Sequence, residues 1–158
     1  MKLKLGIAIG FSCFLFGSCG SKVLFEQNQK IEGASWSSKS PSVFEIDIKD
    51  TVSGYDFYVN IRNTGNYGYS NLYLFVNTRF PNGQLVKDTI ECLMATPEGE
   101  WIGSGVGDLH DQSVLIKRAV NFPVSGRYRF EFIQAMREDP LEGIADVGFR
   151  VEQMENRK

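Results

Sequence analysis

The chain alternates hydrophobic and polar residues with a period of two over most of its length after Pro41. In residues 44–49 (FEIDIK) the apolar side chains fall on one face and the charged side chains on the other. Residues 55–62 repeat this pattern, and residues 127–132 give its most regular example. Because the side chains of a β-strand point alternately to opposite faces, this period predicts strands with one buried and one exposed face.

Further apolar segments complete a set of seven predicted strands. Residues 72–80 are apolar on both faces for most of their length, as in an interior strand, and Pro81-Asn82-Gly83 is a strong turn signal after them. The predicted strands cover residues 44–49, 55–62, 72–80, 85–94, 114–122, 127–132 and 147–152. No helical period exceeds about two turns. This pattern predicts an all-β fold with a single antiparallel β-sandwich or jelly-roll-like domain.

The first residues have the features of an export signal. A basic start (Lys2 and Lys4) precedes an apolar run over residues 5–16, and Gly17-Ser18-Cys19 ends it. Small residues before a cysteine predict a lipoprotein signal peptide over residues 1–18 and lipidation of Cys19. The run is too short for a transmembrane helix, which needs about 20 apolar residues. The alternative acceptor, Cys13, lies too early in the chain.

The stretch between Cys19 and the predicted domain is polar. Residues 19–41 are rich in Gln, Asn, Ser and Lys, which predicts a tether with partial strand character over residues 31–36. The domain itself is expected over residues 42–153. The charged residues 154–158 are expected to form a tail that frays.

Composition restricts the function classes. Without residues 1–18 the chain keeps 140 of its 158 residues, and its formal charge changes from −2 to −4 because Lys2 and Lys4 are removed. A mildly acidic chain does not favour nucleic-acid binding, which uses concentrated basic patches. Cys92 is then the only free thiol, so no intrachain disulfide is possible, and we expect it to be a small buried hydrophobe. Aromatic residues, 13% of the chain, must supply much of the core.

One segment gathers reactive side chains. In residues 101–111 (WIGSGVGDLHD), Trp101 and three alternating glycines precede Asp108, His110 and Asp111. These side chains suggest either a metal-dependent hydrolase or a glycine-rich connection whose acids cap turns. The glycine spacing does not fit a dinucleotide-binding turn, and the chain has no Gly-x-Ser-x-Gly motif. The hypothesis that the protein is not an enzyme and holds no cofactor or metal is therefore favoured.

Two other loops are candidates for partner binding. Residues 134–143 break the strand alternation and carry Arg137, Glu138 and Asp139, in which the arginine can brace a neighbouring carboxylate or face a partner. Residues 63–70 form a glycine-rich loop with two tyrosines. The aromatic residues also permit an alternative function, a glycan- or peptidoglycan-binding module that stacks sugars on Trp36, Trp101, Tyr67 and Tyr69.

Three separated blocks carry a resemblance to a known family. The chain resembles the gliding-motility lipoprotein family GldH in residues 55–76 (YDFYVNIRNTGNYGYSNLYLFV), 101–111 and 134–152 (QAMREDPLEGIADVGFRVE), together with the cysteine motif at Cys19. The resemblance implies a β-rich domain on an acyl anchor. It also implies a role in movement over surfaces, in gliding Gram-negative bacteria, with partners among other envelope proteins of the motility and type IX secretion machinery.

The resemblance transfers one functional residue, Cys19, and no catalytic residues. Gly20, Ser21 and Lys22 contain no acidic run of the kind that sends some such lipoproteins to the cell exterior. The expected location is therefore the outer membrane, with the domain facing the periplasm and attached to the lipid bilayer through Cys19.

Overall fold

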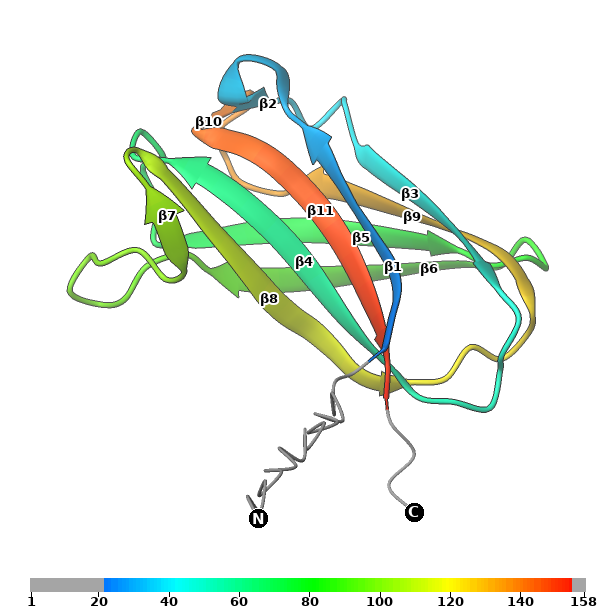
Figure 1. The fold of residues 1–158 in the computed structure, drawn as a ribbon. Coiled ribbons are helices and arrows are strands. Elements are labelled where there is room, and N and C mark those ends of the chain that lie inside the picture. Colours follow the sequence, from blue (N-terminus) through cyan, green and yellow to red (C-terminus); the bar gives the residue numbers. More distant parts are fainter. Residues whose placement is uncertain (1–21, 155–158) are drawn as a thin grey trace, which may run out of the picture.

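The protein folds as two packed antiparallel sheets (Figure 1). The computed structural model describes residues 22–154. The larger sheet has the strand order β1-β11-β4-β8-β7, the second has the order β3-β9-β5-β6, and β2 pairs with β10. The strands are β1 (Lys22–Lys30), β2 (Ser35–Trp36), β3 (Ser42–Ile48), β4 (Tyr55–Thr64), β5 (Asn71–Arg79), β6 (Leu85–Leu93), β7 (Ser104–Val106), β8 (Leu109–Val120), β9 (Gly126–Gln134), β10 (Leu141–Glu142) and β11 (Ile144–Gln153).

All seven predicted strands are confirmed, and the predicted sandwich with them. They correspond to β3, β4, β5, β6, β8, β9 and β11, and β8 is longer than predicted because it begins at Leu109. Within residues 22–154 the only helical segment is one 3-10 turn, η1 (Glu32–Ala34), so no helix there is long and apolar enough to span a membrane. The export signal and Cys19 lie outside the described residues.

The predicted polar tether is wrong for most of its length. Residues 22–30 form β1, which pairs with β11 from Lys22↔Gln153 to Lys30↔Asp146, with one bulge between Val23 and Phe25. The sequence gives a weak signal because β1 is an edge strand, and Phe25 is its main inward apolar side chain. Backbone hydrogen bonds to β11 hold β1 in the sheet, although its sequence lacks a regular alternation of apolar and polar residues.

The prediction that residues 72–80 form an interior strand is confirmed by β5, although the apolar outer face of this strand is not buried. β5 is interior to its sheet, between β9 and β6, yet only its inward side chains are buried. Tyr73 and Phe75 point to the outer face and are 39% and 48% exposed. A two-layer sandwich covers one face of each sheet, so the outer face of an interior strand stays in contact with solvent.

Aromatic rings fill the space between the sheets. Phe149 on β11 has no exposed surface, and its ring contacts five others, with centroid separations from 4.7 Å (Phe130) to 6.3 Å (Phe25). The other three are Phe44, Phe57 and Phe132. Cys92 is buried and unpaired, as predicted, and burial raises the pKa of its thiol to about 12. Ring packing therefore stabilises a sandwich that has no disulfide across its sheets within residues 22–154.

The two open sides of the sandwich are closed by different contacts. At the β1–β3 side, the Gln29 amide donates to the Val43 carbonyl oxygen (2.5 Å) and accepts from the Val43 N–H (3.2 Å). This pairing satisfies backbone groups at the edge of β3. At the β6–β8 side, Lys117 on β8 forms an ion pair with the inward-pointing Asp88 on β6 at 2.7 Å.

We expect Phe149→Ala to lower the free energy of unfolding by about 3–5 kcal/mol, because it removes a fully buried ring and leaves a cavity. The matched variant Phe75→Ala removes a half-exposed ring from the outer face and should cost about 1 kcal/mol or less. Urea unfolding followed by tryptophan fluorescence measures both. Equal losses in the two variants would contradict the assignment of Phe149 to the centre of the core.

Candidate functional site

The predicted reactive segment is a tight β-hairpin. β7 and the start of β8 pair through Ser104↔Asp111, Gly105↔His110 and Val106↔Leu109, which leaves Gly107 and Asp108 as the turn. Gly107 has a positive φ of 67°, as the first central residue of a type II′ turn requires. A Cβ atom on Gly105 would collide with the backbone of Leu109. The spacing of the glycines therefore serves close backbone approach in the hairpin.

Asp108, His110 and Asp111 do not converge on one point. Asp108 accepts a hydrogen bond from the Gly65 N–H at 3.1 Å. Neighbouring residues of a strand face opposite sides, so His110 and Asp111 diverge. Asp111 holds Arg62 through two hydrogen bonds of 2.6 and 3.2 Å, on the outer face of the larger sheet. Residues 22–154 contain no group of three or more potential ligands that could hold a metal ion.

The His110 ring belongs instead to a chain of aromatic contacts. It lies 5.5 Å from the Trp101 ring, which lies 6.3 Å from Tyr67, which in turn lies 5.7 Å from Tyr69. Tyr67 is buried, donates a hydrogen bond to the Asn71 carbonyl oxygen (2.6 Å), and burial raises its pKa far above the ordinary value. The structure thus brings together four candidate residues from two separate segments, 63–70 and 101–111.

Glu138 extends this cluster to the third candidate loop. Tyr69, 39% exposed, donates a hydrogen bond from its hydroxyl to Glu138 at 2.9 Å, and this bond raises the pKa of the tyrosine. Arg137 is exposed and forms no hydrogen bond or ion pair within residues 22–154, so the predicted brace to a neighbouring carboxylate is wrong. Its charge remains free to face a partner.

Asp139 has a structural role. Its carboxylate accepts hydrogen bonds from the Ser38 hydroxyl (2.6 Å) and the Ser38 N–H (2.9 Å), which hold the pKa of this carboxyl below its ordinary value. These bonds join residues 135–140 to the segment after β2. Asp139 therefore stabilises the loop beside Glu138.

The aromatic cluster lies at one end of the larger sheet, and the first described residue lies at the other. At one end, Lys22 pairs with Gln153, and Tyr55 pairs with both Gln153 and Val120. At the opposite end, His110 pairs with Asn63. The ten residues of β4 separate the two ends by about 30 Å. Figure 1 shows β7 and the loop between β6 and β7 far from the first residues of β1.

Exposed apolar side chains accompany the aromatic cluster at this end. We call this region the distal surface and define it by Tyr69, Trp101, Ile102, Val106 and Leu109. Val106, at the hairpin tip, is 91% exposed, and Leu109 opposite it is 41% exposed. Apolar residues at this hairpin tip do not contribute to the core, so the distal surface exposes apolar area to solvent.

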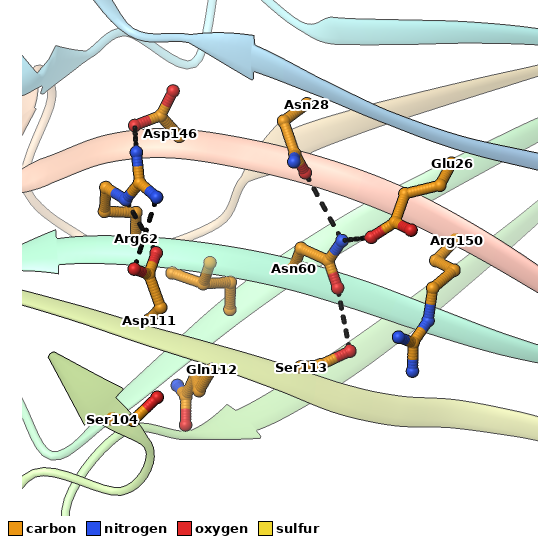
Figure 2. A pocket seen from close by; sticks show the side chains of 11 residues that line it. Glu26, Asn28, Asn60, Arg62, Ser104, Asp111, Gln112, Ser113, Asp146 and Arg150 are labelled. Atoms are coloured by element: carbon orange, nitrogen blue, oxygen red, sulfur yellow. Dashed lines mark hydrogen bonds and ion pairs between the residues drawn. The ribbon is translucent and has the colours of Figure 1, made fainter.

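A polar trough on the outer face of the larger sheet was not predicted from the sequence. It has a volume of about 350 Å³ and is lined by side chains from β1, β4, β7, β8 and β11. Figure 2 shows Arg62 between Asp111 and Asp146, and Asn60 bonded to Glu26, Asn28 and Ser113. These groups are already paired with one another, so the network connects neighbouring strands. The outward positions of the alternating strands were its only signal in the sequence.

Burial removes part of the predicted sugar-stacking set. Trp36 is 1% exposed and donates its indole N–H to the Ser40 carbonyl oxygen at 3.0 Å. Tyr67 is 3% exposed. Two of the four aromatic side chains of the glycan-binding alternative therefore belong to the core, which leaves Trp101 and Tyr69.

Fold and site together define a class: a small β-sandwich domain that exposes apolar side chains at the end opposite to Lys22. Comparison with known proteins then identifies the family. A family model described as GldH lipoprotein matches residues 23–151. A protein of Christiangramia forsetii named gliding motility lipoprotein GldH homolog is 40% identical over 153 residues, which cover 92% of this chain and 93% of the relative.

A second relative, named gliding motility lipoprotein GldH, comes from Flavobacterium johnsoniae. It is 34% identical over 160 residues, which cover 97% of this chain and 99% of the relative. The chain therefore belongs to the GldH lipoprotein family, as the resemblance in the sequence implied.

We expect the Asp139→Asn variant to lose less stability than wild type when the pH falls into the acid range. Because the folded pKa of Asp139 lies below its unfolded value near 3.9, the unfolded state binds more protons, and stability falls as pH drops from about 4 through the folded pKa. Urea midpoints between pH 6 and 2.5 measure this dependence. Glu98→Gln, which removes an exposed carboxylate without a hydrogen bond in the described structure, is the control. Identical acid profiles for Asp139→Asn and wild type would contradict the role of the Ser38 contacts.

Proposed function

We propose that this protein is a non-catalytic, lipid-anchored envelope protein that acts in gliding motility by presenting a binding surface to other proteins of the motility machinery. The names of both relatives support the process. The divergence of Asp108, His110 and Asp111 supports a binding role over hydrolysis. We further propose that this motility machinery is the one linked to type IX secretion.

The anchor of this proposal is Cys19. Its acyl chains hold the protein in a membrane, and two or more chains give stable anchoring. The location that fits the absence of acidic residues at positions 20–22 is the outer membrane, with the domain in the periplasm.

The observation that carries the proposal is the position of β1 between the anchor and the distal surface. β1 starts at Lys22, three residues after Cys19, and three residues of extended chain span at most about 10 Å. The Lys22 end of the sandwich is therefore held at the bilayer. The distal surface, about 30 Å along the sheet, then points away from the membrane.

The chemistry of the distal surface suits a protein partner. Aromatic and aliphatic side chains at its centre supply apolar contact area, as at the centres of protein interfaces. At its border, Arg137, Glu138 and the Tyr69 hydroxyl offer charge and hydrogen bonds. Residues from three loops meet there, and the strands that flank these loops hold them in place. The surface is therefore formed before a partner binds.

Val106→Asp is expected to reduce the recovery of crosslinked envelope partners about tenfold or more, because it places a charge at the most exposed apolar position of the distal surface. The matched control is Val52→Asp, which changes an 86% exposed valine near the membrane end, where the Asn121 amide contacts the Val52 carbonyl oxygen. In-envelope crosslinking followed by identification of the captured proteins measures both variants.

The same experiment tests the anchor through Cys19→Ser, which should also lose the partners because it releases the protein from the membrane. Circular dichroism confirms that each variant is folded. Unchanged capture by Val106→Asp, or equal loss in both valine variants, would contradict the distal surface as the binding site.

A further inference from the structure

β6 is an edge strand, and the hydrogen bonds just before and just after it show which of its residues bond to β5. It pairs only with β5, and the Phe80 N–H donates to the Gln84 carbonyl oxygen (2.9 Å) while the Met94 N–H donates to the Ser70 carbonyl oxygen (2.8 Å). Even-numbered residues therefore bond to β5, because hydrogen-bonded pairs alternate along an antiparallel ladder. The odd-numbered residues direct their N–H and C=O groups outward, and within residues 22–154 these groups have no partner. They are Leu85, Lys87, Thr89, Glu91 and Leu93.

The same five residues also place their side chains on the outer, exposed face. Leu85 is 47% exposed and Leu93 is 60% exposed. Phe75 on β5 lies beside Thr89 on this face and is 48% exposed. A nine-residue strand with unpaired backbone groups and apolar side chains is a template for another strand.

The sequence of β6 is complementary to itself. We propose that β6 pairs antiparallel with β6 of a second copy of this chain, about a two-fold axis at Thr89. In this register Lys87 lies opposite Glu91 of the second copy, and Leu85 lies opposite Leu93 of the second copy. The two Thr89 residues face each other. Five hydrogen-bonded residue pairs, each exchanging two backbone bonds, would join the four-stranded sheets of two copies into one.

Charge selects this register over its neighbours. If the axis moves by one residue, Lys87 faces either Thr89 or Leu93, and a further shift places lysine against lysine or glutamate against glutamate. Opposite charges stabilise directly facing positions, and like charges destabilise them. Lys87 has no ion pair in the described structure, and Glu91 already accepts a hydrogen bond from Asn71 (2.7 Å) that holds its carboxylate on this face. A two-fold axis also uses the same patch on both copies, which gives a closed dimer.

The first experiment is disulfide trapping with Thr89→Cys in the full-length lipidated protein, solubilised in detergent micelles. Opposed residues of a hydrogen-bonded pair have Cα atoms about 5.5 Å apart, which permits a disulfide. We expect mild oxidation to give a covalent dimer. Wild type is the background control, because Cys92 is buried and its raised pKa keeps it unreactive.

Asn82→Cys is the matched control for random collision. Asn82 is an exposed residue in the β5–β6 turn, seven positions from Thr89, so the two turns would lie about 45 Å apart in the proposed dimer. Dimer formation by Thr89→Cys but not by Asn82→Cys supports the proposal. Equal yields, or no dimer with Thr89→Cys, overturn it.

The second experiment reverses the charges. Lys87→Glu places glutamate opposite Glu91 at two symmetry-related positions and should weaken the dimer about tenfold in sedimentation equilibrium. The double variant Lys87→Glu and Glu91→Lys restores opposite charges and should recover the dimer. If the folded double variant is as weak as Lys87→Glu alone, the Thr89 register is wrong. The outcome is independent of the proposed motility role.

Discussion

The pairing of β1 with β11 is the constraint on which the rest of the structure depends. Backbone hydrogen bonds along nearly the whole of β11 fix the direction of the chain from its first described residue. β11 is thereby enclosed between β1 and β4, and Phe149 on its inner face becomes the centre of the aromatic core. Because β1 begins three residues after Cys19, the proposed anchor, the same pairing would give the domain a membrane end and a distal end.

The sandwich then carries different chemistry on its different surfaces. The inner faces are apolar, and the outer face of the larger sheet carries paired polar groups such as Arg62 with Asp111. Apolar side chains meet solvent at the distal surface and at the edge of β6, in Val106 and Leu93 for example, and also at other exposed positions such as Val52. The two surfaces adjoin, because Glu91 and Leu93 at the end of β6 line the same depression as Ile102.

The period-two pattern predicted the strands because each buries one face in the sandwich, as Phe44 and Ile46 do in β3. It failed for β1, where Gln27 and Gln29 occupy positions at an open edge and backbone pairing holds the strand. The apolar residues on both faces of β5 correctly indicated an interior strand, but the sequence does not show that the outer face of that sheet is uncovered.

The candidate site was predictable only as separate segments. The sequence indicated the aromatic and charged loops, and the structure joined Tyr67, Trp101 and His110 through contacts across the sheet ends. The sequence does not show which of Tyr67 and Tyr69 is buried, because this depends on the residues that pack around each ring. The trough around Asn60 requires the register of five strands, which no local pattern contains.

The central claim is that the domain stands on the membrane with its distal surface away from the bilayer. The most direct test is energy transfer from a fluorophore at Val52→Cys or Val106→Cys to acceptor lipids in vesicles that carry the lipidated protein. The account predicts strong transfer from position 52, and weak transfer from position 106, about 30 Å farther away. Equal transfer from the two positions would contradict a fixed orientation, and stronger transfer from position 106 would reverse it.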